Sequence, residues 1–311
     1  MDIQAAVDEY LGAKHNSLTH DTYSWYLHNL SAFLSWCETK ELTDLTQISA
    51  ARVQQFVSDC PSRNTHTRHA RAQVVKGFLS WCAEDDEMGV REKAVRRIEM
   101  PKIEQSEVII FTDEEVLSLF KACDRLRWPH RNRAALHLLL ETGVRASEMC
   151  VDGTRPEEQT GLLLENLIIG RPGTESYIRV IGKGRKIRTI GLGNETRLAV
   201  QKYLHRERAH SDIPYLFLAQ GNAPWSVKML QQFLQRLGRH AGIDDVHPHR
   251  FRHTFAVKQL MAGTSDLVLM RLMGHTTLES TKIYTRAMSQ IQARASATSV
   301  VDQIKGGRKR R

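Results

Sequence analysis

The chain has 311 residues, 41% of them hydrophobic, and lacks the run of about 20 apolar residues that a membrane span needs. Its length fits two domains. The formal net charge of +9 favours a polyanionic partner. The five cysteines are odd in number and contain no CxxC pair, and two early acidic residues argue against a signal peptide. We therefore expect a cytoplasmic protein with reduced thiols and no bound metal.

Charge is distributed unevenly along the chain. Residues 1–105 hold 12 Lys and Arg against 15 Asp and Glu, whereas residues 106–311 hold 32 against 20.

The first part of the chain shows helical periodicity, and Thr19, Ser49 and Asn64 are suitable N-caps. The pentapeptide FLSWC, at Phe33–Cys37 and again at Phe78–Cys82, fits core anchors near the ends of two long helices. Helices are predicted near residues 2–13, 19–40, 49–59 and 64–84.

A linker and a second domain are expected to follow. Residues 101–110 start with Pro101 and lack an amphipathic period, which predicts a linker between a domain at 1–100 and another at 111–311. Thr112 opens a capping box that leads into a helix at VLSLFKACDRL, and the next helix, HRNRAALHLLLETG, should end on Gly143. A polar insert at 151–161 precedes three β-like runs, GLLLENLII, SYIRVIG and KIRTIGL. The sequence thus predicts a mainly α fold, with an N-terminal helical bundle and an α-rich domain that contains a small antiparallel β-sheet.

The second domain carries polar residues whose types suit one chemical task. They are Arg145 in TGVRASE, Lys183 in GKGRKIR, His249 and Arg252 in HRFRHTFA, His275 in LMGH and Tyr284 in ESTKIYTR. They show neither metal-ligand spacing nor a Walker loop. Two arginines can hold a phosphodiester from two sides while a tyrosine oxygen attacks it. The resulting protein–DNA bond would keep the energy of the broken strand, so that rejoining needs neither ATP nor a metal.

The roles follow from residue chemistry. A phenol with a pKa of about 10 is a poor nucleophile at neutral pH, so Tyr284 needs neighbouring cations. Arg145 and Arg252 would bind the phosphate and stabilise its developing charge. Glu148, three residues after Arg145, would orient that guanidinium. Lys183 lies in a Gly-Lys-Gly turn, from which an ammonium can protonate the leaving oxygen.

Histidines would donate hydrogen bonds to phosphate oxygens or accept the proton of the tyrosine, and we assign this task to His249 and His275. The run HPHRFRHTF is ambiguous, because His247 with Arg250 forms the same H-x-x-R frame as the pair that begins at His249. His253 is a further candidate. The pattern alone does not choose between the frames.

The order and spacing of these motifs, over most of residues 106–290, resemble the tyrosine recombinase family of phage integrases and Xer-type enzymes. The family pattern H-x-x-R-H-T-F-A selects His249 and Arg252, and it makes His275 the late His-or-Trp position, with Tyr284 nine residues beyond. The insert at 151–161 is longer and more polar than is usual in the family. The resemblance implies a site-specific DNA recombinase with a 3′-phosphotyrosyl intermediate. Integration, excision and resolution, in a phage, transposon, plasmid or chromosomal system, all fit this pattern.

The resemblance also implies an architecture and partners. The first domain would be the SAM-like core-binding domain, and both domains would close around double-stranded DNA as a C-shaped clamp. We expect a homo-tetramer on paired sites, a monomer or dimer off DNA, a place for accessory proteins, no cofactor and a nucleoid-associated location. Two alternatives stay open: a type IB-like strand-relaxing topoisomerase, and a DNA-binding regulator with a silent site. A silent site, however, would have no reason to keep all six polar residues.

Other residues are candidates for DNA contact. Basic side chains on one face of the predicted 64–84 helix fit the major groove, and those that flank Lys183 suit phosphate contact. A later helix adds glutamines, which can read adenine edges. The candidates are Asn64, Arg68, Arg71, Lys76, Arg185, Lys186, Arg188, Lys228, Gln231, Gln235 and Arg239. An apolar-spaced C-terminal segment is expected to dock on a neighbouring protomer; its apolar residues are Ile291, Val300, Val301 and Ile304.

Overall fold

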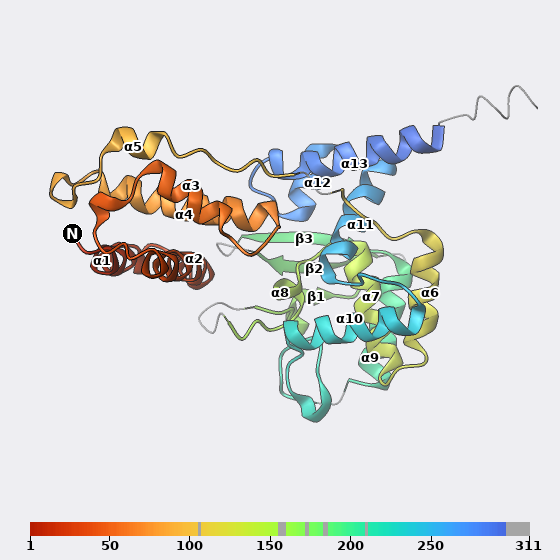
Figure 1. Cartoon of the computed structure of the whole chain (residues 1–311). Helices are drawn as coiled ribbons and strands as arrows, with labels where there is room; N and C mark the ends of the chain where they lie inside the picture. The colour runs from red at the N-terminus through yellow and green to blue at the C-terminus, as the bar shows by residue number, and fades with distance from the viewer. Residues whose placement is uncertain (105–106, 155–159, 172–173, 183–185, 209–210, 297–311) are drawn as a thin grey trace, which may run out of the picture. The chain divides into compact units, whose positions relative to one another are not determined.

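The computed structural model describes residues 1–104, 107–154, 160–171, 174–182, 186–208 and 211–296. The chain divides into two compact units, Met1–Ser106 and Glu107–Arg311. Thirteen α-helices and one three-stranded antiparallel sheet lie within the described residues (Figure 1), which confirms the expected fold class. In that part of the chain, no helix is both long and apolar enough to cross a membrane.

The first unit is a helical bundle. Its helices are α1 (Ile3–His15), α2 (His20–Thr39), α3 (Ala50–Ser58), α4 (Thr65–Cys82) and α5 (Glu92–Arg96). The first four confirm the predicted helices to within two residues at each end. Ser49 and Asn64 are N-caps as expected, because their side-chain oxygens accept hydrogen bonds from backbone N–H groups of the first turn. The Thr19 hydroxyl pairs with the Thr22 hydroxyl instead.

Both copies of FLSWC lie in the core of this unit. Phe33, Cys37, Phe78 and Cys82 are buried in one hydrophobic cluster, as the repeated pentapeptide predicted. The Phe33 ring meets the edge of Phe56 at a centroid distance of 5.2 Å, which links α2 to α3. The two copies therefore anchor α2 and α4 to the same core.

The segment predicted as a linker is hydrogen-bonded to neighbouring helices at both ends. On one side, the His69 ring lies within hydrogen-bonding distance of the Pro101 carbonyl, at 2.8 Å. On the other, the Phe111 N–H donates to the Thr254 hydroxyl at 2.9 Å. Residues 101–104 and 107–110 contain no helix or strand. Their role as a linker between functional domains stays a prediction.

The second unit is an α-rich fold around the small sheet. Its helices are α6 (Asp113–Cys123), α7 (Pro129–Thr142), α8 (Ala146–Met149), α9 (Asn194–Arg206), α10 (Val227–Ala241), α11 (Pro248–Met261), α12 (Asp266–Met273) and α13 (Glu279–Ser296). The strands β1 (Leu167–Ile168), β2 (Ser176–Ile181) and β3 (Ile187–Leu192) pair in that order. The run GLLLENLII was predicted as a strand, but only its end is one. A 3₁₀ turn at Leu164–Asn166 precedes β1; the Asn166 side chain accepts a hydrogen bond from Leu163 N, and Leu163 forms an isolated antiparallel bridge with Tyr215.

One glycine lets two of these helices meet closely. Gly143 ends α7 with φ +57°, and a Cβ on it would lie 2.3 Å from the Phe255 ring of α11. Glycine is therefore needed both for its left-handed backbone and for the close approach. In Figure 1, α11 lies against α7, and it also packs on α12 and α13. The ends of α7, α11 and α12 are thus brought together.

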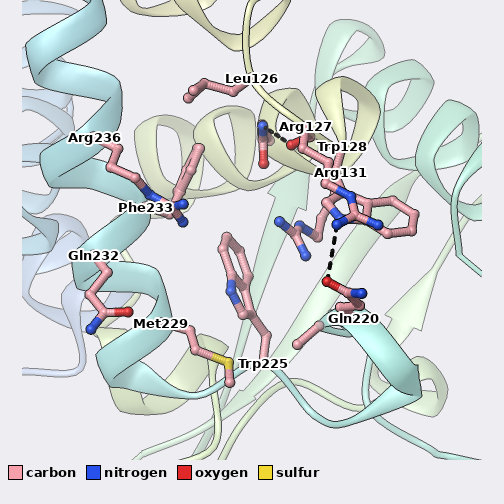
Figure 2. A pocket seen from close by; sticks show the side chains of 12 residues that line it. Leu126, Arg127, Trp128, Arg131, Gln220, Trp225, Met229, Gln232, Phe233 and Arg236 are labelled. Carbon is pink, nitrogen blue, oxygen red and sulfur yellow. Dashed lines mark hydrogen bonds between the residues drawn. The ribbon is translucent and has the colours of Figure 1, made fainter.

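A cavity of about 250 Å³ lies at the opposite, N-terminal end of α7, between α7 and α10 (Figure 2). The guanidinium of Arg131 stands 4.6 Å from the ring centroid of the buried Trp225. Arg131 Nη1 donates to the Leu218 carbonyl, while its Nε is buried with no hydrogen-bond partner among the described residues. Arg127 hydrogen-bonds Gln220 at the rim. The cavity is therefore rich in arginine and tryptophan.

Candidate active site

The first two turns of α11 place their basic residues on two faces. His249, Arg252 and His253 follow helical spacing on one face. Arg250 points to the other side, where Nη2 donates to both carboxylate oxygens of Glu115 at 2.8 and 2.7 Å and its guanidinium lies over Phe111. The frame that begins at His247 therefore ends in a structural ion pair, and the frame that begins at His249 faces the cluster described next.

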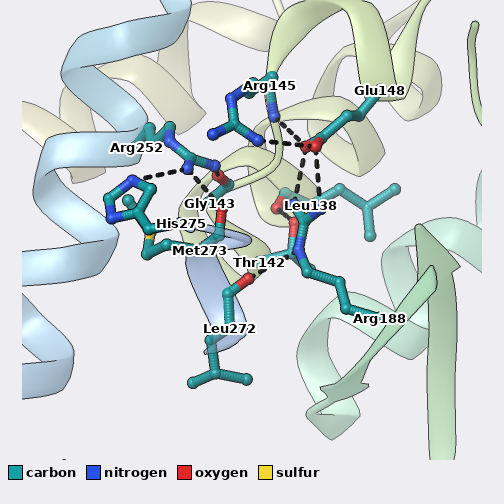
Figure 3. A network of polar contacts seen from close by, with 10 residues as sticks. All are labelled: Leu138, Thr142, Gly143, Arg145, Glu148, Arg188, Arg252, Leu272, Met273 and His275. Carbon is teal, nitrogen blue, oxygen red and sulfur yellow. Dashed lines mark hydrogen bonds and ion pairs between the residues drawn. The ribbon is translucent and has the colours of Figure 1, made fainter. Parts of the chain in front are cut away.

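Arg252 is held by the C-terminal ends of two helices (Figure 3). Its Nη1 donates to the Gly143 carbonyl at the end of α7, and its Nη2 donates to the Met273 carbonyl at the end of α12, each at 2.5 Å. Helix C-termini carry unpaired carbonyls and a partial negative charge, so they suit a buried cation. Burial, followed by repulsion from Arg145, lowers the pKa of Arg252 to about 10, which still leaves it charged at neutral pH.

Glu148 orients Arg145, as predicted from their spacing. Its carboxylate accepts from Arg145 N at 2.7 Å and from Arg145 Nη1 at 3.0 Å, so one residue caps α8 and aims the guanidinium (Figure 3). The same carboxylate accepts from Arg188 Nη1 and Nη2 at 2.8 and 2.7 Å. Burial raises the pKa of Glu148, but the hydrogen bonds and charge of Arg188, with those of Arg145, outweigh burial and lower it overall. Glu148 is therefore an anion that holds two cations.

Arg188 was expected to contact the DNA backbone, and its surroundings favour a different role. Two of its nitrogens donate to Glu148, and Nε donates to the Leu272 carbonyl at 2.8 Å. Its side chain is only 11% exposed. All three guanidinium nitrogens are therefore engaged inside the protein. Arg188 joins β3 to the end of α12 and helps to hold Glu148, which orients Arg145.

His275 follows Gly274, which ends α12 in the left-handed conformation. Its Nε2 lies 3.1 Å from Arg252 Nη2, which can only donate, so Nε2 must be the acceptor. The hydrogen therefore sits on Nδ1, which donates to Thr281 Oγ1 at 3.0 Å. Burial and the neighbouring charge of Arg252 lower the pKa of His275 to about 4, consistent with a neutral ring.

Tyr284 lies on α13 against this cluster. It is 3% exposed, and its ring stacks on His275 with a centroid distance of 6.1 Å and an interplanar angle of 11°. Its hydroxyl lies 3.3 Å from His253 Nδ1. Burial raises the pKa of Tyr284, and the charges of Arg252 and Arg145 oppose that rise. The phenol is therefore protonated, close to two cations and to one histidine nitrogen.

A cleft of about 740 Å³ opens beside these residues. Arg145, Glu148, Arg188 and His275 line it, together with the exposed Lys186 of the β2–β3 turn. Lys183 and Arg185, in the same turn, lie outside the described residues. His249 is exposed at the start of α11, and its ring centroid lies 6.4 Å from that of His253. The structure thus gathers Arg145, Glu148, Arg252, His275 and Tyr284 around one position.

The candidates for DNA contact outside this cluster have two kinds of surroundings. On α10, four form an exposed stripe: Lys228, Gln231, Gln235 and Arg239. On α4, the candidates already have local partners. Arg68 Nε donates to the Ser62 carbonyl, Arg71 lies over the Phe56 ring, and Lys76 Nζ donates to the Ile98 carbonyl. Asn64 is the α4 N-cap.

Two residues of the cluster, His253 and Thr281, were not assigned a role from the sequence. His253 was named only as an alternative, although it follows Arg252 directly and lies four residues after His249. Thr281, 1% exposed, had no local signal, because only the fold brings it to His275. The described residues contain no group of three or more His, Cys, Asp or Glu that could hold a metal ion.

Comparisons with known proteins agree with the motifs. The model of the phage integrase family matches residues 110–290. Tyrosine recombinase XerC of Bacillus licheniformis is 27% identical over 291 residues, which are 89% of each chain. Tyrosine recombinase XerA of Pyrococcus furiosus is 30% identical over 224 residues, or 70% of this chain and 71% of that protein. The chain therefore belongs to the phage integrase family and is a tyrosine site-specific recombinase, so the resemblance stated from its motifs is confirmed.

Solved structures show the same fold. XerH site-specific recombinase, bound to palindromic difH substrate in a post-cleavage complex, has a TM-score of 0.69 at 19% identity over 88% of this chain and 79% of that chain. The Tn1549 transposon integrase, in complex with a circular intermediate DNA, has a TM-score of 0.71 at 16% identity over 96% of this chain and 100% of that chain. Neither the topoisomerase nor the regulator alternative is favoured by these comparisons.

Proposed function

We propose that this protein cuts and rejoins double-stranded DNA at specific sites through a 3′-phosphotyrosyl bond to Tyr284. One observation carries the proposal: Arg145 and His275 line an open cleft, and the guanidinium of Arg252 and the ring of the buried Tyr284 both contact His275. A phosphodiester bound to Arg145 in this cleft would lie close to a second cation, Arg252, and to the nucleophile, whose hydroxyl both cations influence.

Each residue has a role in the proposed reaction. Arg145 and Arg252 bind the non-bridging phosphate oxygens and stabilise the charge of the transition state. His249 and His275 assist them. Lys183 protonates the leaving 5′ oxygen, by resemblance to the family. The products keep the phosphate in a covalent bond, so resealing reverses the same steps and needs no ATP.

A covalent trap tests this proposal. Purified protein is mixed with nicked duplexes drawn from the DNA that flanks its gene, quenched with SDS, and the shifted species are digested and sequenced. We expect a DNA adduct on Tyr284 and none with Tyr284→Phe, which should still bind DNA. Tyr215→Phe, the same chemical change on a half-buried tyrosine of the same unit, is the control and should keep full adduct yield.

The products separate the alternatives. Crossover between two sites supports recombination, whereas plasmid relaxation without crossover would favour the topoisomerase. Tight DNA binding with no adduct from the unmodified protein, on any nicked site, would favour the regulator. An adduct that persists in Tyr284→Phe would contradict the assigned nucleophile.

The assembly and the domain roles belong to the same proposal. We expect the first unit to act as the core-binding domain, and four protomers to assemble on paired sites from a monomer or dimer off DNA, with accessory proteins in some settings. Such a protein would act in the cytoplasm at the nucleoid. Val300, Val301 and Ile304 of the expected docking segment lie outside the described residues, whereas Ile291 packs on the core formed by α11–α13.

Truncation after Ile291 tests the docking segment. Light scattering of the protein with one site and with paired sites measures single-site binding and synapsis separately. We expect removal of residues 292–311 to weaken synapsis more than single-site binding. Unchanged assembly in the truncated protein would rule out this role for the segment.

The exposed stripe on α10 is the proposed reader of the DNA groove. Its four side chains lie on one face, and the helix buries its opposite side. Replacing Lys228 and Arg239 by alanine should weaken binding and reduce its salt dependence, because each phosphate contact releases a counterion. Replacing Gln231 and Gln235 should instead relax sequence preference at constant salt dependence. Binding titrations at several salt concentrations distinguish the two effects.

A further inference from the structure

Among the described residues, one neighbour is placed to accept the proton of Tyr284. The hydroxyl is 3.3 Å from His253 Nδ1, and the two rings are 5.6 Å apart between centroids, at 52°. Tyr284 is 3% exposed, so bulk water has little access to its hydroxyl. A proton that leaves the phenol when its oxygen attacks phosphorus must therefore move to a group inside the protein.

The other two histidines of the cluster are placed differently. Both nitrogens of His275 are engaged, Nε2 by Arg252 and Nδ1 by Thr281, and its ring faces the Tyr284 ring in a stack. His249 lies exposed beyond His253, one helical turn earlier on α11. Only His253 presents a nitrogen to the hydroxyl among the described histidines.

The charge state of His253 suits an acceptor. Burial, followed by the nearby His249, His247 and Arg252, lowers the pKa of His253 to about 4. The ring is therefore neutral at pH 7, with one nitrogen free to accept. A phenol is a stronger donor than a neutral imidazole, so the hydroxyl donates to Nδ1 and the ring hydrogen occupies Nε2.

We propose that His253 is the general base of strand cleavage, taking the proton of the Tyr284 hydroxyl on Nδ1. This inference rests on the proposed function. As the tyrosine oxygen bonds to phosphorus, the electron pair of its O–H bond stays on that oxygen and the proton passes to Nδ1. The P–O5′ bond breaks with its electrons on O5′, which takes a proton from the acid assigned above. On resealing, the His253 imidazolium returns the proton to the departing tyrosine oxygen.

Binding of the substrate brings the proton affinities of His253 and the Tyr284 oxygen closer together. In the empty site, burial and the neighbouring basic groups make His253 a weak base. A phosphate held between Arg145 and Arg252 adds negative charge nearby, which raises the pKa of His253. The phenol meanwhile becomes a stronger acid as its oxygen bonds to phosphorus. Proton transfer in the transition state is favoured when the two affinities converge.

The test compares two leaving groups. His253→Asn keeps an acceptor oxygen near the position of Nδ1 but removes its basicity, and His253→Gln is a second variant in case the first folds poorly. Single-turnover cleavage is measured on a nicked duplex with a normal 5′ oxygen and on one with a bridging 5′ sulfur, whose thiolate leaves without a proton. We expect a loss on the order of 10²- to 10⁴-fold that is the same on both substrates.

Lys183→Ala is the matched control, because a lost general acid should be restored by the sulfur substrate. A second readout is the pH profile of cleavage. In the variants the rate should keep rising with pH, because the phenol must then ionise by itself. The ionisable groups that face His253 are His247, which caps α11, His249 and Arg252 on α11, and Tyr284 on α13.

Two results would overturn the inference. Restoration of His253→Asn by the sulfur substrate would place His253 on the leaving group, and an unchanged cleavage rate in a folded variant would give it no part in proton transfer. Failure of the unmodified protein to form any Tyr284 adduct is a different outcome, because it would reject the proposed function itself.

Discussion

Two arginine-rich regions of the second unit use the same residue type in opposite ways. In the site, Glu148 accepts hydrogen bonds from two arginines, and helix carbonyls accept from Arg252 (Figure 3). In the cavity at the other end of α7, Arg131 lies over Trp225, and its Nε is buried with no partner in the described part of the chain (Figure 2). One region fixes its guanidiniums with a carboxylate and helix-end carbonyls, and the other packs them on aromatic faces with one neutral acceptor each for Arg131 and Arg127.

The difference shows why arginine content alone does not define an anion site. A carboxylate or a helix carbonyl holds particular N–H groups and so aims the remaining ones, which pre-organises them for a ligand. An aromatic face attracts the cation but fixes its direction poorly. The lining of the Arg131 cavity, as far as the structure describes it, also includes no carboxylate and no tyrosine. We interpret it as part of the packing between α7 and α10.

Of the variants that test this difference, Glu148→Ala should have the largest effect, which is on the free energy of unfolding. Removing the carboxylate leaves Arg145 and Arg188 without their anion, and breaking a buried ion pair from one side costs about 3–5 kcal/mol. We expect the free energy of unfolding, measured by urea denaturation, to fall by about that amount. Glu165→Ala, an exposed glutamate of the same unit, is the control and should change it by at most about 0.5 kcal/mol. Equal losses in both variants would contradict the structural role of Glu148.

Arg252→Lys should mainly lower the rate of DNA strand cleavage. A single ammonium cannot reproduce the fork that spans Gly143 O and Met273 O while donating to a phosphate. Loss of one pre-organised donor costs about 3 kcal/mol of transition-state stabilisation, so single-turnover cleavage should fall by about 10²-fold. Arg131→Lys makes the same change in the other region and should cleave at the normal rate. A similar loss in both would mean that the two regions are functionally connected.

The sequence predicted what depends on local pattern. The capping box at Thr112, the helix that ends on Gly143 and the pairing of Arg145 with Glu148 all concern residues a few positions apart. Helix-period and capping rules act at that range, so these features could be read directly.

What the sequence did not predict depends on contacts that only the fold creates, most of them between residues far apart in the chain. Arg188 looked like a surface base among other bases, but the fold brings Glu148 and Leu272 to it from far along the chain. Thr281 reaches His275 only because α12 ends at Gly274 and α13 begins shortly after. The strand predicted at GLLLENLII was wrong in its first part, whose backbone bonds to Pro214 and Leu216, far along the chain, and not to β2.

A smaller effect is expected from Thr281→Val. The change keeps the shape but removes the acceptor for the Nδ1 hydrogen of His275, which then loses its fixed tautomer. A net hydrogen bond is worth about 1 kcal/mol, so cleavage should fall by about 5-fold. Thr281→Ser restores the hydroxyl and should recover the rate, which separates lost hydrogen bonding from altered packing. Failure of the serine variant to recover would point to packing alone.

The smallest effect is expected from Arg131→Met, which replaces the other region's central cation by an apolar side chain of similar length. The change gives up the bond to Leu218 O and the contact with Trp225, but it also removes a buried charge and an unpartnered Nε. Exchanging buried ionic groups for apolar ones is often neutral. We expect the free energy of unfolding to change by less than about 1 kcal/mol, and cleavage to stay normal. If cleavage fell as far as in Arg252→Lys, aromatic packing would orient a functional cation as well as hydrogen-bond acceptors do.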